Sequence, residues 1–237
     1  ALPEAGTEVF APVAWTGNNT AGRNIATGFT VDMTLEQLRT ASSMQANLLW
    51  DRIRGYSSTA AGNSEYLRTQ QTAAESAVTN YNYVPTMDGF SFGSTASGSD
   101  QFNNSGSTAG AWNWKRAPSY FDVVAYTGDS NAGRALSHNL TIPPEMIWFK
   151  SRSNAYNWYV YHKDTGIDKR LVLDSANGAA TGYGTLTFNN TQPSSSVITL
   201  GSWGVINGSG NNNVAYLFAT LDGVSKVGSY TGNGSSQ

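Results

Sequence analysis

The sequence contains no cysteine among its 237 residues, which excludes disulfide bonds and thiolate metal sites. Charged residues are also scarce: they make up 13% of the chain, and the formal net charge is −2. So little basic charge leaves no electrostatic footprint for nucleic acid or an anionic membrane. No apolar run approaches the roughly 20 residues that a membrane helix requires. We therefore expect no nucleic-acid partner and no membrane insertion, and because residues 1–4 lack a basic region followed by an apolar stretch, no signal peptide.

The residues that are abundant favour strands and turns. The chain has 25 glycines and 12% aromatic residues, with many asparagines, serines and threonines and few lysines and glutamates. Helix surfaces favour lysine, glutamate, arginine and alanine. Strand-and-turn proteins instead use threonine, tyrosine, tryptophan and valine, with glycine and asparagine at the turns. The composition therefore predicts an all-β protein whose surface is polar but weakly charged.

An internal repeat organises the chain. Residues 125–134 read Ala-Tyr-Thr-Gly-Asp-Ser-Asn-Ala-Gly-Arg, and residues 14–23 read Ala-Trp-Thr-Gly-Asn-Asn-Thr-Ala-Gly-Arg. Two further pairs of segments match, 90–94 with 198–202 and 111–114 with 215–218. Such self-similarity indicates duplication of one domain. We predict an N-terminal linker at 1–7, a first repeat at 8–118 and a second repeat at 119–229.

The end of the sequence resembles the start of another copy. Tyr230, Thr231 and Gly232 repeat the aromatic-Thr-Gly triad, so residues 230–237 are interpreted as the start of a further repeat or as a C-terminal linker. A short Gly/Ser tail buries nothing and is a poor cap for a repeat array. We expect the natural polypeptide to continue beyond Gln237 into another domain or fibre region.

Short strands separated by Gly-, Ser- and Asn-rich turns predict two tandem homologous β-sandwiches of the jelly-roll or lectin type. Pro12 lies in the first expected strand and favours an edge position or a bulge, because proline cannot donate to the ladder. One segment is ambiguous. Leu35 and Leu38 have helical spacing behind a cap candidate, Asp32, whereas the matching segment 146–150 has a strand pattern. A helical insertion over 33–46 and a strand both stay open.

Several motifs carry a family resemblance. The second half contains Met-Ile-Trp-Phe-Lys-Ser-Arg at 146–152, Tyr-His-Lys at 161–163, Val-Ala-Tyr-Leu-Phe-Ala at 214–219 and Lys-Val-Gly-Ser-Tyr-Thr-Gly-Asn-Gly at 226–234. With the aromatic-Thr-Gly and Ala-Gly-Arg motifs, this pattern resembles a repeated, poorly characterised β-domain of virion structural proteins in marine tailed bacteriophages. The resemblance covers 121–234 well and the first half mainly at 15–23 and 88–115. It implies a virion protein and a β-sandwich, and supplies no catalytic residues.

Residue types that carry chemistry give little support for an enzyme. His138 and His162 have no partner at metal-ligand spacing, so we predict no metal and no cofactor. A glycosidase needs two carboxylates that flank the scissile bond, and no acidic pair recurs in both repeats. Arg23 and Arg134 do recur. A sugar or phosphate ligand is one interpretation, but we favour a structural role in which each guanidinium donates to carbonyls of its turn.

Aromatic residues remain as candidates for ligand binding. Trp112 and Trp114 alternate along a strand and face one side of it, and Tyr216 and Phe218 repeat this spacing. Because large aromatics dominate core burial, Trp112, Trp114 and Trp148 are predicted to be core residues. Three aromatics near loops could instead stack on sugar rings and are the ligand-binding candidates: Tyr156, Trp158 and Trp203.

These observations predict a non-enzymatic bacteriophage virion structural protein, a segment of a tail fibre or capsid surface decoration that contributes to host adhesion. It would be located on the extracellular particle, with other virion proteins, copies of itself and a host-surface glycan as partners. The alternative is a carbohydrate-binding module that recognises host glycans through its loop aromatics. A polysaccharide depolymerase ranks below both because the carboxylate pair is missing.

Overall fold

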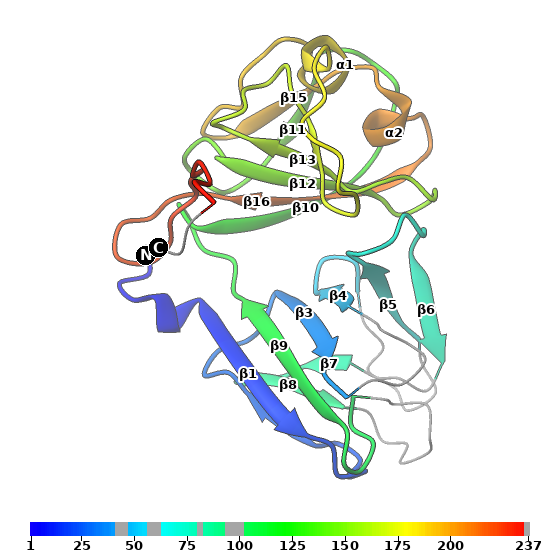
Figure 1. Ribbon diagram of the computed structural model, residues 1–237, viewed down its shortest axis with the longest axis vertical. Coiled ribbons are helices and arrows are strands. Elements are labelled where there is room, and N and C mark those ends of the chain that lie inside the picture. The colour runs from blue at the N-terminus through cyan, green and yellow to red at the C-terminus, as the bar shows by residue number, and fades with distance from the viewer. Residues whose placement is uncertain (41–46, 56–62, 80–82, 93–101, 235–237) are drawn as a thin grey trace.

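The computed structural model describes residues 1–40, 47–55, 63–79, 83–92 and 102–234. In these ranges the chain is predominantly β and forms several antiparallel sheets (Figure 1). The all-β class that the composition predicts is thus confirmed. No helix in the described part of the chain is both long and apolar enough to cross a membrane.

The first half of the chain builds a large sheet and a small one after a short 3-10 turn, η1 (Gly6–Glu8). The large sheet has the strand order β1 (Phe10–Thr16), β9 (Thr108–Trp114), β3 (Met33–Leu38), β4 (Asn47–Asp51), β5 (Asn63–Arg68) and β6 (Ser76–Thr79). The small sheet has the order β2 (Asn24–Ala26), β8 (Gly89–Phe92) and β7 (Tyr83–Pro85).

The second half also builds a large and a small sheet. Its large sheet has the order β10 (Phe121–Thr127), β16 (Asn212–Phe218), β12 (Met146–Ser151), β13 (Tyr159–His162) and β14 (Leu171–Val172). Its small sheet pairs β11 (Arg134–Ser137) with β15 (Val197–Leu200), beside the short helices α1 (Gly184–Phe188) and α2 (Gly204–Asn207). In both large sheets the strand that opens the half pairs with the strand that closes it.

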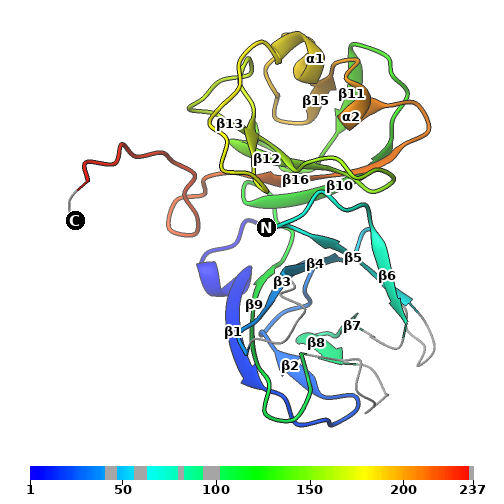
Figure 2. The same ribbon diagram turned by 45° about the vertical axis from the view of Figure 1, so that its right-hand side comes forward.

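The sheets lie in layers (Figure 2), and in the described ranges three apolar clusters pack between them. One cluster lies between the large and small sheets of the first half, and a second lies between those of the second half. The third lies between the two large sheets, which pack on each other through their remaining faces. We call this contact of the two large sheets the junction. Both large sheets are therefore covered on both faces over much of their area.

The alternation of side chains along a strand explains how one sheet serves two clusters. In β16, Val214, Tyr216 and Phe218 point into the junction, whereas Ala215 and Leu217 point into the cluster of the second half. This is why β16 is apolar at successive positions instead of alternating, the pattern expected for a strand buried on both faces. Burying a large apolar side chain stabilises the fold by about 1.5–3 kcal/mol.

The structure tests two sequence predictions for the first half, the edge position of the strand that contains Pro12 and the conformation of residues 33–46. β1 lies at the edge of its sheet, as Pro12 predicts. The helical alternative for 33–46 is wrong over Met33–Leu38, which form the strand β3, and residues 41–46 lie outside the described ranges. The helical spacing of Leu35 and Leu38 was misleading because β3 is inserted between β9 and β4, where ladder hydrogen bonds decide the conformation.

The core assignment of the tryptophans is correct only in part. Trp114 and Trp148 are partly buried and pack against the junction cluster. Trp112, two residues before Trp114 on the same face of β9, is 40% exposed, so its assignment to the core is wrong. The matching residue of the second half, Tyr216, is fully buried. The difference arises because the second half covers one end of the face that carries Trp114 and leaves Trp112 outside.

The repeated aromatic-Thr-Gly segment makes the same anchor in both halves. The indole N–H of Trp15 donates to the carbonyl of Phe102 at 2.8 Å, and the hydroxyl of Tyr126 donates to the carbonyl of Ile206 at 2.7 Å. Both rings are buried. The aromatic residue of the motif therefore ties the end of the opening strand to the segment that precedes the closing strand, which is a turn in the first half and α2 in the second.

The arginine of the motif closes the same turn. Nη1 of Arg23 donates to the carbonyl of Thr16, and Nη1 of Arg134 donates to the carbonyl of Thr127. An asparagine completes each turn: the side-chain amide of Asn103 donates to the carbonyl of Thr20 at 2.9 Å, and Asn207 makes the matching contact with Asn131. These contacts are the ones that a structural turn role for Arg23 and Arg134 requires.

The motif glycines allow backbone to pack on backbone. A Cβ atom at Gly17 would lie 2.1 Å from the carbonyl oxygen of Asn104, and one at Gly128 would lie 2.2 Å from that of Gly208. Gly17→Ala and Gly128→Ala should each lower the free energy of unfolding by about 1–3 kcal/mol, because main-chain atoms must shift. Urea denaturation measures the loss.

Gly178→Ala is the matched control, since nothing lies within 4 Å of a Cβ atom at this exposed position. If either motif variant loses no more stability than this control, close backbone approach is not what fixes glycine in the motif.

Candidate functional site

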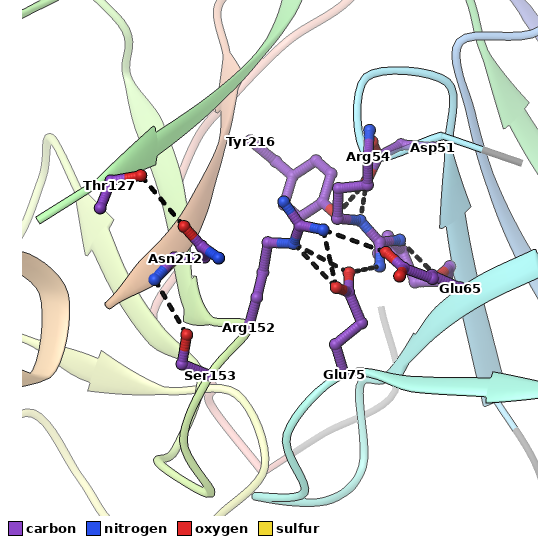
Figure 3. A network of polar contacts seen from close by, with 10 residues as sticks. Asp51, Arg54, Glu65, Glu75, Thr127, Arg152, Ser153, Asn212 and Tyr216 are labelled. Carbon is purple, nitrogen blue, oxygen red and sulfur yellow. Dashed lines mark hydrogen bonds and ion pairs between the residues drawn. The ribbon is translucent and has the colours of Figure 1, made fainter. Parts of the chain in front are cut away.

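Charged side chains of both halves meet at one side of the junction, far apart in sequence but close in space (Figure 3). Asp51, at the end of β4, and Arg54, in the turn that follows, have fully buried side chains. Nε of Arg54 donates to Oδ2 of Asp51, and the hydroxyl of Tyr216 on β16 donates to the same oxygen at 2.6 Å. A residue of the second half thus completes the coordination of a buried carboxylate of the first.

Glu75 and Arg152 extend the network across the junction. Oε1 of Glu75 accepts from Nη1 of Arg54 at 2.7 Å, and both oxygens of Glu75 accept from Nε of Arg152 at 2.9 Å. Nη2 of Arg152 also donates to Glu65 at 3.0 Å. A main-chain bond from the N–H of Glu75 to the carbonyl of Arg152, 3.0 Å long, holds the two segments together. The guanidinium of Arg152, from the second half, therefore lies between carboxylates of the first half.

The electrostatics of the network follow from its composition of three carboxylates and two guanidiniums. Burial alone would raise the pKa of Glu75, but hydrogen bonds from Arg152 and the charge of Arg54 hold it below its ordinary value. Burial and the adjacent Glu75 carboxylate raise the pKa of Glu65, the most exposed member. Burial would lower the pKa of Arg54, but the charges of Asp51, Tyr216 and Glu75 raise it above its ordinary value. Glu75 is thus fully charged at neutral pH.

Two more side chains of the second half donate to main-chain carbonyls of the first. Nζ of Lys150, a buried residue of β12, donates to the carbonyl of Thr72 in the first half at 2.9 Å and also to that of Tyr156 in its own half at 2.7 Å. Trp158 donates from its indole N–H to the carbonyl of Arg68 at 2.8 Å and stacks on Tyr216. Burial lowers the pKa of Lys150 to about 8.

The three aromatic ligand candidates do not converge on one surface. Trp158 is fully buried in the junction and offers no ring face to a ligand. Tyr156 is 37% exposed beside it. Trp203 lies elsewhere, against Tyr159 and Tyr183, at ring-centroid distances of 4.6 and 5.4 Å.

Trp203 belongs to a cage of aromatic rings that already holds a cation. The guanidinium carbon of Arg170 lies 3.7 Å from the ring centroid of Tyr183, 4.6 Å from that of Tyr159 and 4.7 Å from that of Trp203. Cation–π attraction explains the arrangement. Because Arg170 occupies the ring faces, this cage fixes the loop before α1 and leaves no free stacking platform.

The histidines have structural contacts. Nδ1 of His138 accepts from the N–H of Leu140 at 3.2 Å, and its Nε2 lies 3.2 Å from the carbonyl of Ser194. Burial lowers the pKa of His138. His162 accepts from the N–H of Asp164 at 3.3 Å. Across the described ranges, no group of three or more His, Asp or Glu side chains is placed to share a metal ion.

Glu65 and Glu75 deserve comparison with a catalytic pair, because environments that push two carboxyl pKa values apart also characterise acid–base catalysts. Both oxygens of Glu75, however, are bound by guanidinium groups of Arg54 and Arg152. A carboxylate held in this way has no free position for a water molecule or a substrate proton. The arrangement is suited to joining the two halves of the molecule.

Comparison with known families places the chain in one of them. Residues 5–237 match the model of a domain of unknown function, DUF7483. The chain belongs to the DUF7483 family. The match spans both large sheets, so the junction lies inside the DUF7483 domain. No curated protein and no solved structure matches the chain.

Sequence reasoning missed the network of this DUF7483 domain. Asp51 and its partner Tyr216 are 165 residues apart in the sequence, and Glu75 and Arg152 are 77 residues apart. One signal was the placement of arginines in a chain with few charges. Lys150 gave another, since a lysine inside an apolar strand pattern needs an acceptor.

Removing the charge of Glu75 tests the network. Glu75→Gln leaves two largely buried guanidiniums with weaker acceptors and should lower the free energy of unfolding at pH 7 by about 3 kcal/mol. The folded-state pKa of Glu75 is lowered, so its contribution is present above pH 4.5 and is lost as the pH falls through the folded-state value. The difference between the wild type and Glu75→Gln should therefore shrink below pH 4.5.

Urea denaturation at pH 7 and pH 3 measures both effects, with Asp222→Asn, at an exposed turn position, as the control. A difference that stays the same at both pH values would contradict the assigned role of Glu75.

Lys150 predicts a second pH dependence, of the same sign as that of Glu75 but in the alkaline range. Between pH 8 and 9.5 the folded state has released the Lys150 proton, whereas the unfolded chain keeps it up to its ordinary pKa of 10.5. The free energy of unfolding should rise with pH in this window, by at most about 1.4 kcal/mol per pH unit. Lys150→Met should abolish the rise. The window ends near pH 10, because the buried Tyr83 and Tyr216 have raised pKa values and reverse the slope there.

Proposed function

We propose that this DUF7483 domain is a non-enzymatic structural module made of two homologous β-sandwich units, 8–118 and 119–229, that are locked together at the junction. In this proposal the module belongs to the surface of a bacteriophage particle, as a segment of a tail fibre or a surface decoration, and acts with other virion proteins and with further copies of itself. The observation that carries the proposal is the network of Asp51, Arg54, Glu75, Arg152 and Tyr216 across the junction.

Duplication of one unit is supported by matched topology. The order β1-β9-β3-β4-β5 in one large sheet corresponds to β10-β16-β12-β13-β14 in the other. The small sheets correspond through the pairs β2-β8 and β11-β15. The anchors match as well, because Trp15 and Tyr126 occupy the same place in their halves and each bonds to the segment before the closing strand.

A structural role is supported by the way the two units are joined. Domains that move relative to each other usually share small and rather polar contacts. Here aromatic and aliphatic residues of both large sheets form a continuous apolar cluster, and the Arg152–Glu75 ion pair and the hydrogen bond from Tyr216 to Asp51 bridge its side. Removing one partner from such a buried network is costly, so the two units are expected to keep one relative orientation. A fixed orientation is what a spacer in a shaft or shell requires.

Surface labelling of particles tests the role. Antibody fragments raised against the folded chain should label purified phage particles at positions that repeat with the particle's symmetry, and a reconstruction of the particle should show the two stacked large sheets there. Fragments raised against a chain unfolded by urea are the control. Absence of the chain from the proteins of purified particles, measured by mass spectrometry, would overturn the virion assignment.

A further inference from the structure

An open groove lies on the junction-facing side of the first large sheet, on the part of that face that the second half does not cover. It has a volume of about 640 Å³, within the range of about 300–1,000 Å³ typical of small-ligand sites. Strands β1, β9 and β3 supply its walls and floor through side chains on one face of the sheet. The residues that shape it are Pro12, Ala14, Gln37, Arg39, Gly110 and Trp112.

The register of the strands explains the shape. Trp112 on β9 lies opposite Pro12 on β1 and Leu35 on β3, and in the next row Gly110 lies between Ala14 and Gln37. Residues two apart on a strand share a face. The indole of Trp112 therefore stands beside a row in which β1 and β9 contribute only the small residues Ala14 and Gly110. The groove is therefore a shelf of small residues bordered by the indole of Trp112.

The side chain of Trp112 is available for contact with a ligand. Its ring is 40% exposed, and among the described residues it makes neither a ring contact nor a hydrogen bond through its indole N–H. Large exposed aromatics beside a concave surface are a feature of binding sites, because they supply contact area at low conformational cost. The matching Tyr216 is buried against the first half, so the groove has no counterpart in the second.

Polar groups of the groove determine the chemistry of the ligand. The amide of Gln37 and the guanidinium of Arg39 are exposed and have no partner in the described part of the chain. Arg39 is held by hydrogen bonds from the N–H groups of Arg39 and Thr40 to the carbonyl of Thr108. It is the single charged residue among those that line the groove, so the groove is positive in a chain whose net charge is −2.

We propose that this groove binds an acidic saccharide, with one pyranose ring stacked on Trp112. The apolar C–H face of the sugar would pack on the indole, the Gln37 amide would bond its hydroxyls, and the fork of Arg39 would bind a carboxylate or sulfate group bidentately. The inference goes beyond the proposed structural role and does not depend on it, because it needs the first large sheet alone.

Titration calorimetry on the full chain tests the proposal with three probes: oligogalacturonate, its methyl ester, and a sulfated galactan oligosaccharide of similar length. Binding of one or both acidic probes, with weaker binding of the ester, is expected, and the two acidic arms distinguish carboxylate from sulfate. Trp112→Ala should weaken binding on the order of tenfold or more, the effect of losing a central aromatic anchor. Arg39→Gln should remove the preference for the acidic probe over the ester.

Two further variants guard against misfolding. Gly110→Val fills the shelf, and the nearest atom to its Cβ is the carbonyl oxygen of Val13 at 3.4 Å, so the strand should accept it while binding is lost. Tyr156→Ala removes another exposed aromatic and should leave binding unchanged. Failure of all three probes to bind, or binding that Trp112→Ala does not weaken, overturns the proposal. So does an oligomer that Trp112→Ala dissociates in sedimentation, because the groove would then be a contact between copies.

Discussion

The burial of Asp51 and Arg54 between two sheets is the constraint on which the rest of the structure depends. An isolated charge in such a place would cost many kcal/mol, and it is tolerated when it is paired and hydrogen-bonded. Asp51 takes its partners from its own turn and from Tyr216 of the other half, and Arg54 shares Glu75 with Arg152. The two halves must therefore dock in one position, because a small shift would leave these charges unpaired. The apolar junction cluster supplies the favourable energy, and the network selects the geometry.

Because the two large sheets pack on each other in one position, residues that match between the two halves have different surroundings. Tyr216 and Phe218 both pack in the junction. Of the matching pair in the first half, Trp114 packs there and Trp112 remains outside. Gln37, which pairs with Gly110 in β9, matches Lys150, which pairs with Val214 in β16. Gln37 faces an open groove, and Lys150 is buried and donates to the carbonyl of Thr72 across the junction. The packing of the two large sheets thus leaves this face open in the first half and closed in the second.

Local features of the fold could be read from the sequence, and features made by docking could not. The motif at 14–23 and 125–134 predicted matching turns, because its aromatic, glycine and arginine each act within the unit that carries them. Pro12 located an edge strand for the same local reason. The spacing of Leu35 and Leu38 failed because alternate residues of the same segment, Met33 and Leu35, face the junction, and a short segment fits both periods. Its position near a loop predicted an exposed ring at Trp158. The ring is instead buried against the first half, and nothing in the residues around Trp158 indicates that contact.

The central claim is that the two halves form one rigid body, and the absence of cysteine makes a direct measurement simple. Spin labels attached at Met87→Cys in the first half and Leu173→Cys in the second, both exposed positions, report the distance between the halves by double electron–electron resonance. The account predicts a single narrow distance distribution at neutral pH. A broad or bimodal distribution would show that the halves move independently, and would contradict a junction fixed by its buried charges.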